Sequence, residues 1–160
     1  MTNRASKYSN ALGLYVNCEI DNGSVSRVFV TMSPRFAEEG NEILDRICEY
    51  LSGEAVDLSD IPIEPRGTDF QKKVWSALMD IPRGEVRTYS EIARVIGKPK
   101  GARAVGNAVG SNHLLILVPC HRVVAKHGLG GFSAEGGIET KMKILALEKV
   151  PASEVAKIAR

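Results

Sequence analysis

The chain has 160 residues, of which 44% are hydrophobic and 25% are charged, and its formal net charge is +2. This composition excludes a disordered chain, and the length suffices to bury a core as one compact unit or as two small domains. Three cysteines, an odd number without Cys-x-x-Cys spacing, argue against a disulfide framework and a cysteine-based metal site, and the polar N-terminal residues argue against a signal peptide or membrane span. We therefore expect a cytoplasmic protein with no membrane partner.

The charge is unevenly distributed along the chain. Residues 1–65 contain 5 Lys or Arg and 11 Asp or Glu, a net charge of −6, whereas residues 66–160 contain 16 and 8, a net charge of +8. The connection over residues 53–67 contains two glycines and two prolines, so we predict an N-terminal α/β domain at 1–65 and a second domain at 66–160. The basic second half favours a polyanion partner, although a solvated basic surface would show the same balance.

The first half predicts a small antiparallel sheet with a helix. Apolar and polar residues alternate over 12–20, a period of two that is typical of a half-buried strand. The sequence Asp-Asn-Gly at 21–23 favours a hairpin turn, and the returning strand is expected to bury Val28 and Met32. Apolar residues at helical spacing over 43–51 then predict a helix that covers the hairpin.

Two capping boxes predict the start of helices in the second half. Thr68 with Gln71 opens an amphipathic helix, and Thr88 with Glu91 opens a shorter one. A turn with two glycines follows, and then a third helix over about 102–111. We therefore predict an α+β protein whose second domain is mostly helical and contains a winged-helix-like helix-turn-helix.

The third helix has a face with almost no side chains, because Ala102, Gly106 and Gly110 recur at every fourth position. Glycine inside a helix costs about 1 kcal/mol relative to alanine, so the pattern requires an explanation. One explanation is close packing against another element. The other is entry into the DNA minor groove, which is only about 6 Å wide. Lys100 and Arg103 add positive charge beside this face.

The most hydrophobic run, 114–118, is continuous, aliphatic and short, which predicts a buried strand that Pro119 ends. Cys120 and His121 follow at once. A thiol that has a base and a cation, here Arg122, beside it is in the setting that stabilises a thiolate at neutral pH. The pattern therefore favours Cys120 as a nucleophile held at a rigid strand end.

The alternative interpretation is a structural cysteine, since free cysteine is among the most buried residue types. Cys18 lies on the apolar side of an alternating strand and Cys48 on the apolar face of a helix, so both are expected to fill the core. Neither has a base and a cation as immediate neighbours.

The C-terminal part predicts a loop and a last helix. The glycine-rich segment 128–133 would let backbone amides approach a ligand closely. Ile138, Met142 and Leu145 indicate a helix, with Glu148 at the edge of its buried face. A carboxylate at that position could orient a histidine, although a surface glutamate is the usual interpretation.

Taken together, these residues resemble the O6-alkylguanine-DNA alkyltransferases. The resemblance covers about residues 67–149 with the spacing between motifs intact, whereas the first 65 residues match only in their general order of elements. The stretches that carry it are Phe70-Gln71, Val74-Trp75, Ile81-Pro82-Arg83-Gly84, Thr88-Tyr89-Ser90-Glu91-Ile92-Ala93, Ala102-Arg103-Ala104-Val105-Gly106, Asn112 and Pro119-Cys120-His121-Arg122-Val123-Val124.

The resemblance implies an activity and its partners. An alkyl group on O6 of a guanine, flipped out of duplex DNA through the minor groove, would pass irreversibly to the cysteine, once per protein molecule. No cofactor or metal would be required, and the protein would act as a monomer. The implied catalytic residues are Cys120, His121, Glu148, Tyr89 and Asn112; the implied DNA-binding residues are Arg103, Ala102, Gly106, Gly110, Lys100 and Tyr89; and the implied base pocket comprises Val123, Ser133, Phe132 and Leu115.

The family also implies individual roles. His121 would act as a base through a water and would be oriented by Glu148. Tyr89 would crowd the target phosphate and hydrogen-bond the flipped base, while Arg103 would fill the gap left in the stack. The remaining implied roles are a brace for the active-site turn at Asn112 and contacts to the guanine from the Val123 carbonyl and from Ser133.

Three positions depart from the family pattern: His113 and Leu115 stand where prolines are frequent, and Phe132 stands where a tyrosine is common. Three alternatives remain. A cysteine hydrolase could use Cys120 and His121, with the glycine-rich loop as an oxyanion hole. A helix-turn-helix regulator would leave the thiol unexplained. Alkyltransferase-like proteins bind alkylated DNA but lack the cysteine.

Overall fold

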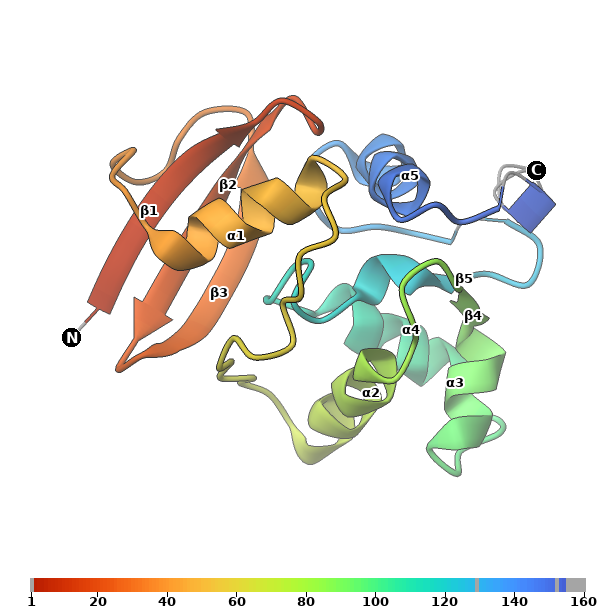
Figure 1. Cartoon of the computed structure of the whole chain (residues 1–160). Helices are drawn as coiled ribbons and strands as arrows, with labels where there is room; N and C mark the ends of the chain where they lie inside the picture. The colour runs from red at the N-terminus through yellow and green to blue at the C-terminus, as the bar shows by residue number, and fades with distance from the viewer. Residues whose placement is uncertain (1, 129, 152, 155–160) are drawn as a thin grey trace. The chain divides into compact units, whose positions relative to one another are not determined.

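Figure 1 shows a computed structural model of the chain, which describes residues 2–128, 130–151, 153 and 154. The chain forms two compact units. The first contains Met1–Arg66 and His113–Leu117, and the second contains Gly67–Asn112 and Val118–Arg160. The predicted α+β class is confirmed. Among the described residues, every helix is too short or too polar to cross a membrane.

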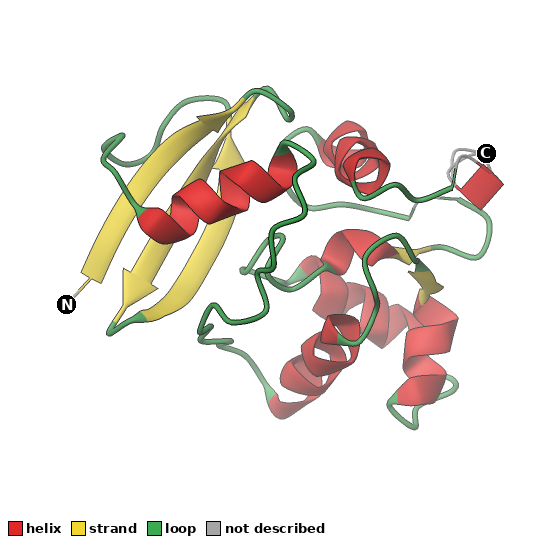
Figure 2. Ribbon diagram, viewed as in Figure 1, coloured by secondary structure: helices red, strands yellow, loops and turns green. Residues whose placement is uncertain are grey.

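The first unit is an antiparallel sheet with one helix (Figure 2). Its strands lie in the order β1 (Thr2–Ser9), β2 (Leu14–Asp21) and β3 (Ser24–Thr31), and α1 (Glu42–Leu51) packs on β1 and β2. The hairpin predicted at 21–23 is present, because Asn22 and Gly23 both adopt the positive φ that a tight turn requires. The sequence did not predict β1, since Ala5 is the one buried apolar side chain among its described residues.

Apolar side chains of α1 and of the sheet form the core of this unit. Leu44, Ile47 and Leu51 of α1 are buried, as are Val16 and Cys18 of β2. Each fully buried aliphatic side chain of this size contributes about 1.5 to 3 kcal/mol relative to an exposed one. The expectation for Met32 is wrong: β3 ends at Thr31, and the Met32 side chain is 77% exposed in the bend that follows.

The run 114–118 is buried, but it is not the strand that the sequence predicted. It makes an isolated bridge to β3, in which the amide of Val28 donates to the His113 carbonyl and the amide of Leu115 donates to the Val28 carbonyl. The chain then turns, with the amide of Leu117 bonded to the Leu115 carbonyl and Ile116 at φ 71°. The hydrophobic run correctly predicted burial, which does not by itself distinguish a strand from a buried turn.

The second unit is mainly helical. In chain order it contains α2 (Asp69–Met79), β4 (Arg87–Thr88), α3 (Tyr89–Val95), α4 (Ala102–Gly110), the 3-10 turn η1 (Cys120–Arg122), β5 (Val123–Val124) and α5 (Gly137–Leu147). Strands β4 and β5 pair in parallel. Both predicted capping boxes are confirmed: Thr68 caps α2 together with Gln71, and Thr88 caps α3 together with Glu91.

Helices α2, α3 and α4 pack together around a common core. Val74 and Leu78 of α2, Ile92 of α3 and Val105 of α4 are buried. The buried indole of Trp75 donates its Nε1 hydrogen to the Ala108 carbonyl at 2.8 Å. This bond fixes α4 against α2 and thereby fixes the helix end that leads toward the cysteine.

Candidate active site

Cys120 is the first residue of η1, and it lies next to β5 on a turn braced from the preceding loop. Asn112 provides the brace: its Nδ2 donates to the Val118 carbonyl at 2.9 Å, and its side chain also hydrogen-bonds Cys120. The thiol itself is only 5% exposed. The sulfur is therefore held by local geometry, with little freedom to move.

Burial and the polar groups around Cys120 shift the pKa of its thiol in opposite directions. Burial raises the pKa of the thiol, because a thiolate loses its hydration there. The hydrogen bond from Asn112, the charge of Lys141 and two backbone amides act in the opposite direction. Burial raises the pKa of Cys18 to about 12 and that of Cys48 to about 11. At Cys48 the charge of Lys7 acts in the opposite direction. Cys120 thus has a set of thiolate-stabilising groups that the other two cysteines lack.

His121 and Glu148 form a fully buried pair, with Nε2 of the imidazole 2.9 Å from Oε1 of the carboxylate. Because an ionised carboxylate only accepts hydrogen bonds, the ring hydrogen is assigned to Nε2, which donates to Glu148. Nδ1 then carries a lone pair, and it has no protein partner among the described residues. Burial lowers the pKa of His121 despite the opposing effect of Glu148. The imidazole is therefore neutral at pH 7 and can accept a proton through Nδ1.

Arg122 does not act as the cation beside the thiol that the sequence predicted. Its guanidinium forms a bidentate ion pair with Glu148, in which Nε donates to Oε1 at 3.0 Å and Nη2 donates to Oε2 at 2.6 Å. The third nitrogen, Nη1, donates to the Ile81 carbonyl at 2.7 Å. The planar fork matches a carboxylate, so the charge of Arg122 neutralises Glu148 instead of stabilising the sulfur.

The cation near the sulfur is Lys141, which the sequence interpretation missed. Its side chain is completely buried, and Nζ donates to the carbonyls of Val123 at 2.7 Å and Gly131 at 3.1 Å. Lys141 and Glu148 share the buried face of the last helix with Ile144 and Leu145, at positions i, i+7, i+3 and i+4. This helical spacing is the sequence signal that could have revealed Lys141.

The inner face of α5 is consequently rotated from the predicted one. Ile138 is 48% exposed and Met142 is half-buried, so the stripe expected from the apolar residues is only partly correct. The placement of Glu148 at the edge of a buried face also needs correction, since the carboxylate is 2% exposed. An apolar pattern does not count charged residues, although Lys141 and Glu148 both belong to the buried face.

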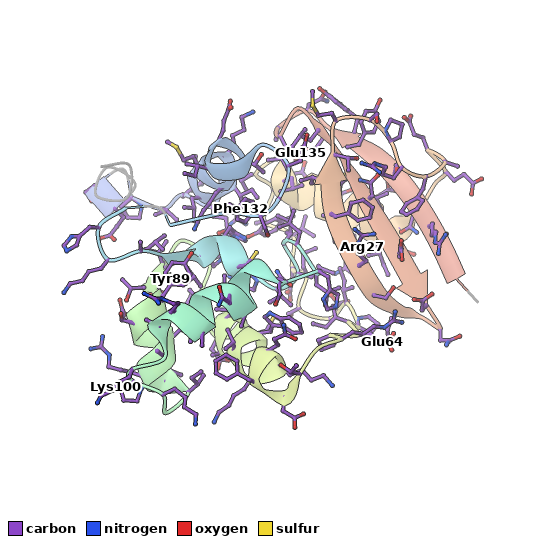
Figure 3. All side chains as sticks on the ribbon, turned by 180° about the vertical axis from the view of Figure 1, so that it is seen from behind. Arg27, Glu64, Tyr89, Lys100, Phe132 and Glu135 are labelled. Atoms are coloured by element: carbon purple, nitrogen blue, oxygen red, sulfur yellow. The ribbon has the colours of Figure 1, made fainter. Side chains whose placement is uncertain are left out.

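A cavity of about 430 Å³ opens beside Cys120. Helix α3 contributes Tyr89, and the glycine-rich loop contributes Phe132; both side chains are labelled in Figure 3. The lining residues are Tyr89, Gly106, Val109, Gly110, Cys120, Gly131, Phe132 and Ser133. A cavity of this size is within the range of small-molecule sites, and its walls are largely apolar.

The glycine-rich loop is fastened to the rest of the cavity. The Ser133 hydroxyl donates to the Gly110 carbonyl at 2.9 Å, and the amide of Gly131 hydrogen-bonds the Tyr89 oxygen. Gly130 has φ +71°, and a Cβ at that position would lie 2.7 Å from the Tyr89 hydroxyl. Only glycine fits there, because the backbone conformation and the tyrosine both exclude a side chain.

The small-residue face of α4 borders this cavity. A Cβ at Gly106 would contact the Tyr89 ring at 3.8 Å, an ordinary distance, and a Cβ at Gly110 would meet nothing within 4 Å. Close packing therefore does not explain either glycine. Arg103 on α4 and Lys100 in the preceding turn are exposed, and Figure 3 shows the Lys100 side chain pointing outward.

Two predicted pocket residues do not line the cavity. Leu115 is buried in the segment that belongs to the first unit, where its amide bonds β3. The Val123 side chain is also buried outside the cavity lining, and its carbonyl accepts from Lys141. The other predicted residues of the catalytic turn and the cavity come together around Cys120.

We predict that Glu148→Gln destabilises the protein by about 3 to 5 kcal/mol, because it removes the charge that compensates Arg122 in a site where Arg122 is only 12% exposed. Urea unfolding at pH 7 measures the loss. The matched control is Glu139→Gln, an exposed glutamate on the same helix, which should change the free energy of unfolding little. Equal effects of the two substitutions would contradict the prediction.

Comparison with known proteins identifies the family. The sequence model described as "6-O-methylguanine DNA methyltransferase, DNA binding domain" matches residues 69–150. A methylated-DNA–protein-cysteine methyltransferase of Haemophilus influenzae is 50% identical over 103 residues, which cover 64% of this chain and 56% of the relative. A probable one of Acanthamoeba polyphaga mimivirus is 47% identical over 106 residues, which cover 66% of this chain and 70% of the relative. The aligned part thus spans little more than half to about two thirds of these relatives.

Solved structures extend the similarity over nearly the whole chain. The crystal structure of Mycobacterium tuberculosis O6-methylguanine methyltransferase has a TM-score of 0.79 at 33% identity and covers 93% of both chains. That of Mycobacterium tuberculosis OGT in complex with DNA also has a TM-score of 0.79, at 34% identity, and covers 97% of this chain and 94% of that one. The residue pattern, the fold and these relatives together show that the chain belongs to the 6-O-methylguanine DNA methyltransferase family.

Proposed function

We propose that this protein repairs duplex DNA by moving the alkyl group of an O6-alkylguanine, mainly O6-methylguanine, onto its own Cys120 in a single turnover. The observation that carries the proposal is a buried thiol that borders a cavity large enough for a base and is followed by a buried histidine-carboxylate pair. The curated relatives that share about half of their aligned residues with this chain are methylated-DNA–protein-cysteine methyltransferases.

The catalytic roles follow from the geometry of the pair. Nδ1 of His121 accepts the thiol proton through a water, while Glu148 holds the ring by Nε2 and Arg122 keeps the carboxylate ionised. The sulfur lone pair then forms a bond to the alkyl carbon as the carbon–O6 bond breaks. That electron pair passes to the guanine, which takes up a proton, so that the proton lost by the thiol is balanced.

The product explains the single turnover. A thioether has no carbonyl for water to attack, so neither hydrolysis nor a second nucleophile in the site regenerates the thiol. The chemistry of the reaction requires no cofactor, and the described residues contain no cluster of metal-ligating side chains. Absence of a cofactor, cytoplasmic location and a monomeric state remain predictions.

The DNA-binding part of the proposal rests on α3 and α4. We assign them as a helix-turn-helix in which α4 enters the minor groove with the face of Ala102, Gly106 and Gly110. Close packing does not explain the two glycines, and the exposed Arg103 and Lys100 provide positive charge beside them. A base inside a duplex is out of reach of the sulfur, so it must be flipped into the cavity, with Arg103 filling the gap.

The remaining roles concern the pocket. The Tyr89 hydroxyl and Ser133 lie in the cavity wall, where they can hydrogen-bond the base, and Phe132 provides an aromatic face for stacking. Asn112 braces the catalytic turn through Val118. We assign residues 66–160 as the domain for DNA binding and alkyl transfer and residues 1–65 as a separate N-terminal α/β domain.

The glycine-rich loop argues against the alternative function, a cysteine hydrolase. An oxyanion hole needs backbone amides that are free to donate, but the Gly131 amide bonds the Tyr89 oxygen. Stoichiometry separates the two functions.

Incubation with duplex DNA containing O6-methylguanine should add one methyl group per protein molecule, on Cys120. Intact-mass spectrometry followed by peptide mapping measures both the number and the position. Cys120→Ser should abolish the mass shift and retain DNA binding, because the substitution leaves the α4 surface intact. Cys48→Ser serves as a matched control and should react like the native protein. Turnover beyond one equivalent would favour the hydrolase.

His121→Gln should slow methyl transfer at pH 7 by about 100-fold, since the general base is lost. The pKa of His121 lies below its usual value, so the base is already neutral at pH 7 and the native rate should not rise from pH 7 to 8. In the variant the rate should rise with pH, because hydroxide must deprotonate a thiol whose pKa is raised by burial. Single-turnover rates across this range test the role, and a variant with the native pH profile would remove His121 from the mechanism.

Arg103→Ala should slow repair of duplex DNA about tenfold or more, because filling the gap offsets an unstacking cost of a few kcal/mol. Reaction with free O6-methylguanine base should change little, since no stack is opened. The matched control is Arg46→Ala, which removes the same charge from α1 in the first unit. Equal losses on duplex and free base would assign Arg103 a different role.

A further inference from the structure

Lys141 is the most unusual residue of the second unit, because its side chain is fully buried. A charged ammonium is expensive to bury unless it is paired, and lysine is almost never found inside without a compensating group. Nζ donates hydrogen bonds to the carbonyl oxygens of Val123 and Gly131.

The two carbonyls belong to segments that both border the reactive sulfur. Val123 begins β5, directly after the turn that carries Cys120. Gly131 belongs to the loop that lines the cavity, and its amide bonds the Tyr89 oxygen. The peptide units around Gly131 are therefore held from opposite sides, by Lys141 through the carbonyl and by Tyr89 through the amide. Lys141 ties the cavity wall to the strand behind the nucleophile.

The charge has a natural counterpart in the thiolate. Arg122 is occupied by Glu148, whereas Lys141 lowers the pKa of Cys120, and the thiolate in turn raises the pKa of Lys141. Each group thus favours the ionised form of the other. The buried ammonium can therefore stabilise the negative charge that the sulfur acquires when His121 takes its proton.

We propose, on the basis of the alkyl-transfer function above, that Lys141 is a positioning residue whose ammonium stabilises the Cys120 thiolate and fastens the Gly131 loop to β5. One buried side chain then links activation of the sulfur to the shape of the base pocket.

The proposal has a consequence for pH. Burial lowers the pKa of Lys141 to about 8, so its charge is present below pH 8 and is lost above it. The titratable groups that face Lys141 are Cys120 and His121 of η1, with Tyr89 of α3 on the far side of the Gly131 peptide. Burial keeps His121 neutral and raises the pKa of Tyr89, so among the described residues we expect Lys141 to be the group near Cys120 whose charge changes around pH 8.

Four variants of the full chain separate charge from tether. Lys141→Met removes both, Lys141→Gln keeps an N–H donor without charge, and Lys141→Arg keeps the charge. Lys143→Met is the matched control, an exposed lysine on the same helix. Circular dichroism and thermal unfolding verify that each variant folds.

The main measurement avoids DNA, so it remains valid if the proposed function fails. The rate of Cys120 alkylation by iodoacetamide is followed by intact mass and peptide mapping from pH 6 to 10. At pH 7 we expect the rate to fall about tenfold or more in Lys141→Met and Lys141→Gln, because only the thiolate reacts and an opposite charge nearby increases its population. Lys141→Arg and Lys143→Met should stay within about twofold of the native rate.

Methyl transfer from O6-methylguanine DNA is measured on the same proteins. Loss of transfer in the native protein with the expected iodoacetamide pattern would reject the repair function and leave the Lys141 assignment intact. Within the repair reaction, Lys141→Gln should be less impaired than Lys141→Met, because it retains a donor for the loop. Equal impairment of these two variants would contradict the proposal that Lys141 fastens the loop.

Native iodoacetamide rates in Lys141→Gln and Lys141→Met, or a loss in Lys141→Arg as large as in Lys141→Met, would overturn the role of the charge. If neither neutral variant folds, the pH profiles of the native protein and Lys141→Arg decide. The native rate should rise less steeply above pH 8 as Lys141 loses its charge, whereas the arginine variant should continue to rise. Coincident profiles would refute the proposal.

Discussion

The buried carboxylate of Glu148 is the constraint on which the site depends. A carboxylate with almost no access to water is stable only when its lone pairs accept strong hydrogen bonds, and here the imidazole of His121 and the guanidinium of Arg122 supply them. The same bonds fix the imidazole tautomer and leave Nδ1 as the basic nitrogen. Arg122 also reaches the carbonyl of Ile81, so the catalytic turn, the segment after α2 and the end of α5 are joined through one ion pair.

Helix α5 carries groups that act on both Cys120 and His121. Lys141 and Glu148 are seven residues apart on its buried face, about 10.5 Å along the helix axis, and they carry opposite charges toward successive residues, Cys120 and His121. The apolar residues between them, Ile144 and Leu145, anchor the helix in the core. A shift of this helix would therefore change the environments of Cys120 and His121 together.

Local features of the sequence predicted local features of the structure. The two capping boxes, the Asp-Asn-Gly turn and the helix of small residues depend on hydrogen bonds and dihedral angles within a few residues, so the chain specifies them wherever it folds. The pairing of His121 with Glu148 came from the family resemblance, and the structure adds its geometry. The strand β1 escaped prediction because its described residues offer a single buried apolar side chain, Ala5.

By itself, the sequence determined the family and the capped starts of α2 and α3, and it predicted Cys120 as the nucleophile, because these features reside in residue types at fixed spacing. Only the tertiary structure decided which cation serves which anion. Arg122 is only two residues from Cys120 in sequence yet bonds Glu148, whereas Lys141, twenty-one residues from Cys120, lowers the pKa of the thiol. It also decided that the apolar run 114–118 is a buried turn. A hydrophobic side chain needs a core and a buried charge needs a partner, and the sequence shows both needs. Which partner each group meets depends on how distant segments pack.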